Sequence, residues 1–222
     1  MARIKGVLLD IDGTLLESNE AHARSWVEVF LRHGFEVPLD KVRRLIGKGG
    51  DKLLPEAIGV EHDSPLGKKL SQERSALFKE AYLPKLRPTP GARNLLLRLR
   101  SERLTLTVAT SATPDELNPL LDAARVRDLV DEQTTSGDAA KSKPDPDIIH
   151  AAIERSGHAP RELIMLGDTP WDIEAASRGG VSTIAVRCGG WDDAGLAGAV
   201  AIYNDPADLL AHYSGSPLGR ME

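Results

Sequence analysis

The chain alternates between short apolar runs and amphipathic stretches over most of its 222 residues. Four runs are rich in aliphatic and β-branched side chains and end in small or polar residues, which is typical of strands buried on both faces of a parallel sheet. They are residues 4–10 (IKGVLLD), 103–112 (RLTLTVATSA), 161–168 (RELIMLGD) and 181–190 (VSTIAVRCGG). A further short strand is predicted around residues 129–136.

Helical patterns separate these predicted strands. Apolar residues recur at helical intervals in residues 91–102, 114–126 and 146–157. Alternation of strands and helices favours a parallel sheet covered by helices on both faces. We therefore predict the α/β class, with a Rossmann-like parallel sheet as its core.

One long stretch interrupts this alternation. Residues 17–87 show helical periodicity, as in NEAHARSWVEVFLRHG and LGKKLSQERSALFKEAYL, and no convincing strand. The helical pattern is followed by LPKLRPTPG (residues 83–91), whose three prolines and glycine predict a stiff connector. We therefore expect two domains, an α/β core from residues 1–16 and 88–222 and an inserted all-helical cap from residues 17–87.

Composition and charge narrow the choice of partners. The chain is 41% hydrophobic, 27% charged and only 4% aromatic, and its net charge is -5 without any basic run, so neither nucleic acid nor a membrane is an expected partner. The apolar N-terminal run is broken by aspartates and is too short for a signal peptide or a membrane span. A single cysteine, Cys188, suits a reducing compartment. We expect a cytoplasmic protein, and its oligomeric state does not follow from the sequence.

Polar side chains follow the predicted strands, at the edge of an open α/β sheet where ligands bind. Asp10 and Asp12 end the first strand, and both face the same side because side chains alternate along a strand. The other candidates are Thr110 and Ser111 after the second strand, Asp168 and Asp172 after the third, and Lys141 and Lys143 in the segment KSKPDPD.

Each of these residues taken alone fits a structural role, such as a helix cap, a turn or a surface charge. Together they indicate chemistry, because four carboxylates in one crevice would repel one another strongly without a cation. Oxygen ligands without nearby histidine or cysteine suit Mg²⁺, which keeps ligand positions for water and for a substrate phosphate. A lysine and hydroxyl groups beside the ion would complete a phosphate-binding site.

Four segments, in this order, resemble the motifs of the haloacid dehalogenase-like hydrolases: LLDIDGTL, VATSA, KSKPDPDI and LGDTPWDIEAASRGGV. The helical insertion between the first two motifs is similar to the cap of the phosphoglycolate phosphatase and β-phosphoglucomutase branch. The resemblance therefore covers nearly the whole chain. It implies a Mg²⁺-dependent phosphatase that acts on a small phosphorylated metabolite.

The resemblance also assigns roles to the candidate residues. Asp10 would attack the phosphorus and form an aspartyl-phosphate. Asp12 would protonate the leaving oxygen and later take a proton from water, for which burial should raise its pKa. Thr110 would bind phosphate oxygens, and Lys143 would neutralise phosphoryl charge in preference to Lys141, which does not precede the proline.

The same resemblance implies the binding residues. Mg²⁺ would be held by Asp10, the main-chain carbonyl of Asp12 and Asp168, with Asp172 close by. Gly13, Thr14 and Ser111 belong to the motifs and are further expected substrate contacts.

The predicted cap offers candidates for substrate recognition. The glycine-rich segment RRLIGKGGDKLL (residues 43–54) could place Lys48 over the active site with Arg44 nearby, or it is an ordinary turn between helices. His22 lies where sugar-phosphate mutases of this family carry a histidine, although a position on the helix surface is the favoured interpretation. Glu17 stands where many relatives carry aspartate, and we expect it at the hinge.

Two alternatives stay open. A phosphohexomutase of the β-phosphoglucomutase type would use the same motifs, but its cap loop usually carries an arginine where this chain has Gly50. A non-catalytic ligand-binding or regulatory protein would be expected to lack Asp10, Asp12, Lys143 or Asp168, and all four are present. The family's dehalogenases generally lack an aspartate at the place of Asp12, so a phosphoryl group is the expected group transferred.

Overall fold

The computed structural model describes residues 3–219, and its centre is a six-stranded parallel sheet with the strand order β3-β2-β1-β4-β5-β6. The strands are β1 (Gly6–Leu9), β2 (Thr105–Ala109), β3 (Glu132–Thr134), β4 (Leu163–Gly167), β5 (Ser182–Val186) and β6 (Ala201–Tyr203). The predicted α/β class is confirmed. The strand expected around residues 129–136 is present as β3, whereas the sequence patterns did not predict β6.

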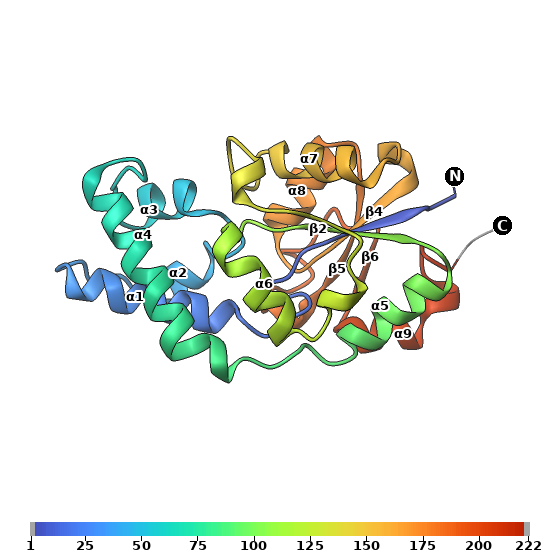
Figure 1. Cartoon of the computed structure of the whole chain (residues 1–222), viewed down its shortest axis with the longest axis horizontal. Coiled ribbons are helices and arrows are strands. Elements are labelled where there is room, and N and C mark those ends of the chain that lie inside the picture. Colours follow the sequence, from blue (N-terminus) through green and yellow to red (C-terminus); the bar gives the residue numbers. More distant parts are fainter. Residues whose placement is uncertain (1–2, 220–222) are drawn as a thin grey trace.

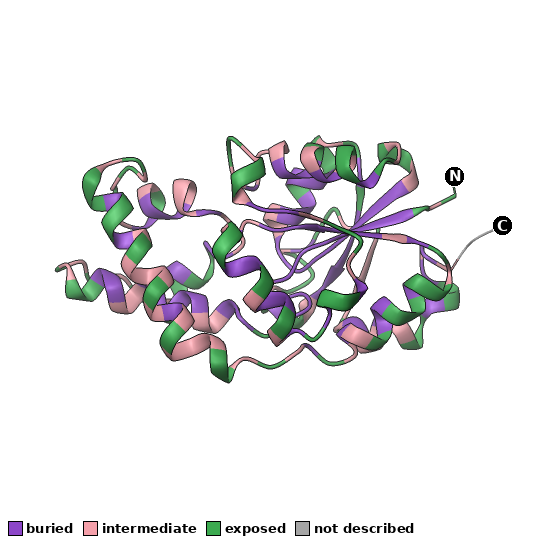
Figure 2. Ribbon diagram, viewed as in Figure 1, coloured by how far each residue is buried: buried purple, intermediate pink, exposed green. Residues whose placement is uncertain are grey.

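Helices cover both faces of this sheet (Figure 1). On one face lie α5 (Ala92–Ser101), α6 (Pro114–Ala123) and α9 (Pro206–Ala211), and on the other lie α7 (Asp147–Ser156) and α8 (Pro170–Arg178). Leu9 packs in the apolar cluster that the sheet forms with α5, α6 and α9. Its neighbour Leu8 packs in the cluster formed with α7 and α8, because successive side chains point to opposite faces. Figure 2 shows the strands as the buried centre of the molecule. The continuous apolar run of β1 is therefore the sequence pattern of a strand that helices cover on both faces.

The remaining helices form a separate group beside the sheet (Figure 1). They are α1 (Asn19–Arg32), α2 (Leu39–Arg43), α3 (Gly50–Ile58) and α4 (Pro65–Leu77), and a π-helical turn (Phe78–Tyr82) and a 3₁₀ turn (Leu83–Lys85) follow α4. They pack around their own apolar cluster, which includes Trp26, Phe30 and Leu70. We call residues 17–87 the cap.

The chain enters and leaves the cap at one place. The amide of Glu17 donates to the carbonyl of Arg87 at 3.0 Å, and the amide of Thr89 donates to the carbonyl of Leu15 at 3.0 Å. Glu17 itself is exposed beside these two connectors. The hydrogen bonds fit a two-segment hinge, and the division into a core (1–16 and 88–222) and a cap (17–87) stays our proposal.

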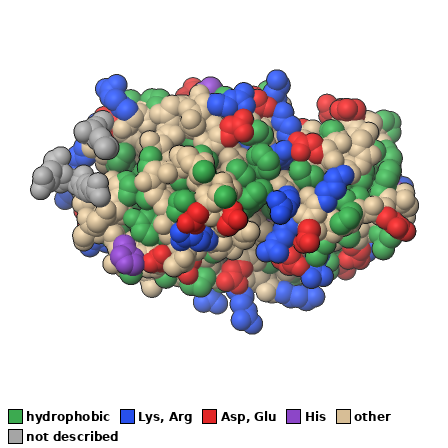
Figure 3. Space-filling view, turned by 180° about the vertical axis from the view of Figure 1, so that it is seen from behind, with side chains coloured by type: hydrophobic (Ala, Val, Ile, Leu, Met, Phe, Trp, Pro, Cys, Tyr) green, Lys and Arg blue, Asp and Glu red, His purple; other side chains and the backbone are tan. Residues whose placement is uncertain are grey.

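Short 3₁₀ turns lie between several of these elements, at Arg127–Leu129, Ser136–Asp138, Pro160–Glu162, Arg187–Gly189 and Tyr213–Gly215. Within residues 3–219, none of the helices combines the length and the apolar character that a membrane span requires. On the face drawn in Figure 3, acidic and basic side chains are interspersed. That face does not offer the basic stripe that is typical of nucleic-acid binding.

Candidate active site

Three neighbouring strands bring the predicted residues together. Leu9 of β1 pairs with Val108 of β2 on one side and with Leu166 of β4 on the other. Asp10, Thr110 and Asp168 follow these strands directly, so they lie beside one another at the carboxyl edge, and all three are buried. The strand order reverses direction between β1 and β4, which is where ligands bind in open α/β sheets.

Lys143 joins two of the carboxylates. Its side chain is fully buried, and its Nζ lies 2.7 Å from Asp10 Oδ1 and 2.7 Å from Asp172 Oδ1. Lys141, the other lysine of this segment, is exposed. The structure therefore places Lys143, and not Lys141, among the candidate catalytic carboxylates.

Residues near the start of the cap hold Asp168. The amide nitrogen Nδ2 of Asn19 donates to Asp168 Oδ2 at 2.8 Å, and the hydroxyl of Thr14 donates to Asp168 Oδ1 at 3.0 Å. Gly13 has a positive φ of 79°, and a Cβ atom there would lie 2.3 Å from Asp168 Oδ2. Glycine is required at this position because both the backbone conformation and the space exclude a side chain.

Asp172 has two partners at the start of α8. Its Oδ2 accepts hydrogen bonds from the amide and the hydroxyl of Thr169 at 3.1 and 2.6 Å. Its own amide donates to Thr169 Oγ1 at 3.2 Å, which completes the capping box of the helix. Its Oδ1 accepts from Lys143. Asp172 is therefore both the acidic residue of the capping box, whose N-cap is Thr169, and a partner of the buried lysine.

The acidic cluster could hold a metal ion. One oxygen from each of Asp10, Asp168 and Asp172 lies within 4.8 Å of the others. Burial raises the pKa of Asp10 to about 7, against the attraction of Lys143, and burial and the charge of Asp10 raise the pKa of Asp168. Three buried carboxylates thus lie together with one ammonium group, which contacts only Asp10 and Asp172. A hard cation with oxygen ligands would remove this imbalance of charge.

Asp12 lies in a different environment from the other aspartates. Its Oδ1 accepts a hydrogen bond from Ser18 Oγ at 2.5 Å and lies 2.8 Å from His22 Nε2. Burial would raise the pKa of Asp12, but the charge and hydrogen bond of His22 and the hydrogen bond of Ser18 outweigh it and lower the pKa. The expectation of a raised pKa is thus wrong for this arrangement, in which His22 and Ser18 favour the ionised form of Asp12.

His22 is not on the helix surface, which corrects the favoured interpretation of the sequence. It is 7% exposed, and its ring stacks on Phe78 with the centroids 4.0 Å apart. Phe78 comes late in the sequence of the cap, in the π-helical turn after α4. Packing within the cap therefore directs His22 towards Asp12.

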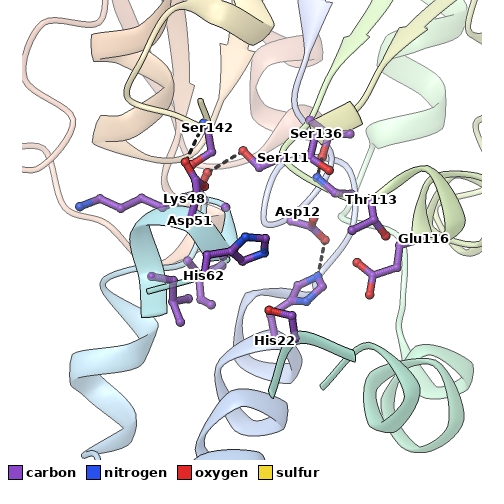
Figure 4. A pocket seen from close by; sticks show the side chains of 18 of the residues that line it. Asp12, His22, Lys48, Asp51, His62, Ser111, Thr113, Glu116, Ser136 and Ser142 are labelled. Atoms are coloured by element: carbon purple, nitrogen blue, oxygen red, sulfur yellow. Dashed lines mark hydrogen bonds and ion pairs between the residues drawn. The ribbon is translucent and has the colours of Figure 1, made fainter. Parts of the chain in front are cut away.

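A cavity of about 400 Å³ opens in front of these residues. Asp10, Asp12 and Thr110 line it from the core, and His22 and Arg74 line it from the cap. Figure 4 shows the carboxylate of Asp12 meeting His22 inside this cavity. The candidate nucleophile and the candidate proton carrier therefore face one space that can hold a small ligand.

The two predicted hydroxyl residues make different contacts. Thr110 Oγ1 accepts a hydrogen bond from the amide of Ala112 at 3.1 Å. Ser111 Oγ donates to the carbonyl of Gly47 in the cap at 3.1 Å. Both residues line the cavity, and in this structure Ser111 also connects core and cap.

The basic residues expected from the glycine-rich cap segment do not point into the cavity. Lys48 lines it, but its Nζ binds Glu56 at 2.7 Å and lies 4.0 Å from the centre of the Trp171 ring. Figure 4 shows the Lys48 side chain pointing away from the other lining residues. Arg44 is exposed and lines a separate surface hollow with Arg43 and Asp40.

The same cap segment instead binds the loop that carries Lys143. The amide of Ser142 donates to Asp51 Oδ2 at 3.1 Å, and Lys52 Nζ binds Asp145 Oδ2 at 2.7 Å. These partners lie 91 and 93 positions apart in the chain. No sequence signal predicts such pairs, nor the contact of Asn19 with Asp168.

Comparisons with known proteins show the family of the chain. A model of the haloacid dehalogenase-like hydrolases matches residues 7–186. A phosphoglycolate phosphatase from Nitrosospira multiformis is 30% identical over 191 residues, which is 84% of either chain, and an N-acetylmuramic acid 6-phosphate phosphatase from Pseudomonas aeruginosa is 30% identical over 217 residues, 94% of either chain. The crystal structure of a hydrolase from Pseudomonas syringae matches with a TM-score of 0.88 at 29% identity, covering 95% of this chain and 98% of that one. The chain therefore belongs to the haloacid dehalogenase-like hydrolases, as its four motifs predict.

Proposed function

We propose that this protein is a cytoplasmic phosphatase that hydrolyses small phosphorylated metabolites through an aspartyl-phosphate on Asp10. The observation that carries the proposal is the placement of Asp10, a buried carboxylate bound to Lys143 and open to the cavity that Asp12 also lines. The two relatives named above are phosphatases, which supports the same reaction class. The residues whose loss would indicate a non-catalytic protein are all present, namely Asp10, Asp12, Lys143 and Asp168.

The reaction divides into two displacements at phosphorus. In the first, the carboxylate of Asp10 attacks the phosphorus and the ester oxygen leaves with a proton from Asp12. In the second, water attacks the aspartyl-phosphate, and Asp12 accepts a proton from that water. The lowered pKa of Asp12 suits the second displacement, in which Asp12 accepts a proton, whereas the first displacement requires its protonated form.

Mg²⁺ fits the acidic cluster, which Asp10, Asp168 and the main-chain carbonyl of Asp12 would offer to it. When bound, the ion would neutralise negative charge on the phosphoryl group. Asn19 and Thr14 fix the orientation of Asp168. Asp172 Oδ1 lies 2.7 Å from Lys143 Nζ, so we assign Asp172 to the positioning of that lysine, close to the ion.

We expect phosphate release to depend on Mg²⁺. Purified protein is incubated with a panel of small phosphomonoesters, with MgCl₂ or with EDTA, and inorganic phosphate is measured. Release should stop with EDTA and return when excess Mg²⁺ is added, because without the ion the negative carboxylates repel the negative phosphoryl group. No release from any ester in the presence of Mg²⁺ would overturn the phosphatase assignment.

Replacement of Asp12 with asparagine should lower steady-state turnover by about 10²-fold or more, because the amide cannot transfer a proton. Phosphate release and the amount of phosphoenzyme formed in the first turnover are both measured. Glu17→Gln is the control, since it removes a nearby carboxylate that is exposed at the hinge. Unchanged turnover in Asp12→Asn would remove Asp12 from the proton transfers.

A phosphohexomutase stays a second candidate because His22 is buried and lies 2.8 Å from Asp12, at a place where sugar-phosphate mutases of this family carry a histidine. Gly50, in the place of the mutase arginine, counts against it. A mutase would show a burst of phosphorylation and little steady release with a simple ester. Sugar phosphates with a bisphosphate primer would then give an isomerised product.

A further inference from the structure

Glu116 is a buried carboxylate on the cavity wall that the proposed reaction does not use. It lies in the first turn of α6 and is 1% exposed. Two donors from cap helix α4 bind it, Arg74 Nη1 at 3.0 Å and Ser75 Oγ at 2.8 Å. Both bind the same oxygen, Oε1, and the described residues give no donor to Oε2. Figure 4 shows the carboxylate pointing into the cavity, so Glu116 presents an acceptor oxygen to a bound ligand.

The lysine and arginine on the cap side of the cavity already have acidic partners. Arg74 binds Glu116, and Lys48 binds Glu56. A carboxylate or a second phosphate on the ligand would therefore have to compete with these acidic partners. It would also lie near the buried charge of Glu116, and a like charge at close range is a strong means of rejecting a ligand. The charge of this wall disfavours a second anionic group on the substrate.

The remaining polar atoms of the wall suit hydroxyl groups. Ser71 Oγ and Arg74 Nε are buried and have no hydrogen-bond partner among the described residues. The other polar side chains there include Ser75, Thr113, Ser136 and His62. Figure 4 shows His62 facing Glu116 across the cavity. Because a hydroxyl group both donates and accepts, a ligand with several hydroxyls can donate to the free oxygen of Glu116 and also bind the lining hydroxyls of Thr113 and Ser136.

The size of the cavity points the same way. The cavity has a volume of about 400 Å³ and extends from Asp10 in the core to Arg74 and His62 in the cap. A two-carbon ligand such as phosphoglycolate would leave most of this volume unfilled. A ligand that reaches from the nucleophile to Glu116 needs a longer body beyond its phosphate.

We propose that the substrate is a phosphorylated sugar or polyol, and that Glu116 selects it by accepting hydrogen bonds from its hydroxyl groups. Arg74 and Ser75 are positioning residues that hold the Glu116 carboxylate in place from the cap. The selection thus works only when cap and core meet as they do here. This inference rests on the phosphatase function proposed above and names its substrate class.

The experiment compares kcat/KM for esters with and without hydroxyl groups. Glucose 6-phosphate, ribose 5-phosphate and glycerol 3-phosphate are the hydroxylated substrates, and propyl phosphate and phosphoglycolate are the comparison substrates. The wild type should prefer the best hydroxylated ester to both comparison esters by at least about tenfold, and Glu116→Gln should reduce that preference by about tenfold or more. Asp115→Asn is the matched control, because this neighbouring acid of α6 is exposed and outside the cavity, and it should keep the preference.

The outcomes separate three cases. If Glu116→Gln lowers kcat/KM for all esters by the same factor and keeps the preference, Glu116 has only a structural role and the proposal is overturned. Should Glu116→Gln fail to fold, as judged by circular dichroism, the wild type still decides, since equal or better hydrolysis of propyl phosphate or phosphoglycolate contradicts the proposal. Release of phosphate from no ester at all would instead overturn the phosphatase function itself.

Discussion

Replacement of Asp10 with asparagine is expected to abolish phosphate release, with kcat lower by at least about 10⁴-fold, while the protein stays folded. The amide has nearly the shape of the carboxylate but cannot form an acyl-phosphate. The fold should tolerate it, because burial already raises the pKa of Asp10 to about 7 and Lys143 keeps Asp172 as a partner. Steady-state phosphate release and urea unfolding at pH 7 measure the two effects.

Asp115→Asn serves as the control for Asp10→Asn, since it makes the same chemical change at an exposed aspartate. Its turnover and its free energy of unfolding should stay close to those of the wild type. Retention of more than about 1% of wild-type activity in Asp10→Asn would contradict the role of Asp10 as nucleophile. A large loss of stability would leave the activity uninterpretable for that variant, and trapping of phosphoenzyme in the wild type would then decide.

Much of the sheet could be predicted because strands covered on both faces have an unmistakable pattern. All four residues of β1 are buried, and so are all five of β4, which gives continuous apolar runs. The edge strand β6 is only three residues long and none of them is fully buried, so its short apolar run does not distinguish it from a loop. The fold class and the family were therefore predictable, whereas the last strand of the sheet was not.

The site could be predicted where the sheet alone determines it. Asp10, Thr110 and Asp168 come together because each directly follows one of three adjacent strands. The lowered pKa of Asp12 could not be predicted, because it depends on how helix packing in the cap directs His22 towards it. The same is true of Glu116, whose partners come from a cap helix far away in the chain.

The buried lysine is the residue on which the acidic cluster depends most. Lys143→Met should lower the free energy of unfolding at pH 7 by about 3–5 kcal/mol, because it leaves buried carboxylates without their cation. Turnover should fall by about 10³-fold, since the charge that faces the phosphoryl group is lost. Urea unfolding and phosphate release test the two expectations. Lys141→Met is the matched control, because this exposed lysine of the same segment should be dispensable.

The pH dependence of the free energy of unfolding that Lys143→Met loses identifies the cause of this loss. The pKa of Asp10 is already raised to about 7 by burial, and removal of Lys143 removes the attraction that opposes this rise. A group whose pKa is raised in the folded state contributes stability below its unfolded pKa and loses that contribution as the pH rises through its folded pKa. The deficit of Lys143→Met relative to the wild type should therefore be larger at pH 9 than at pH 6. An equal deficit at both values would mean that the ionisation of Asp10 is not coupled to Lys143, and that the charge of Lys143 does not hold the catalytic carboxylates together.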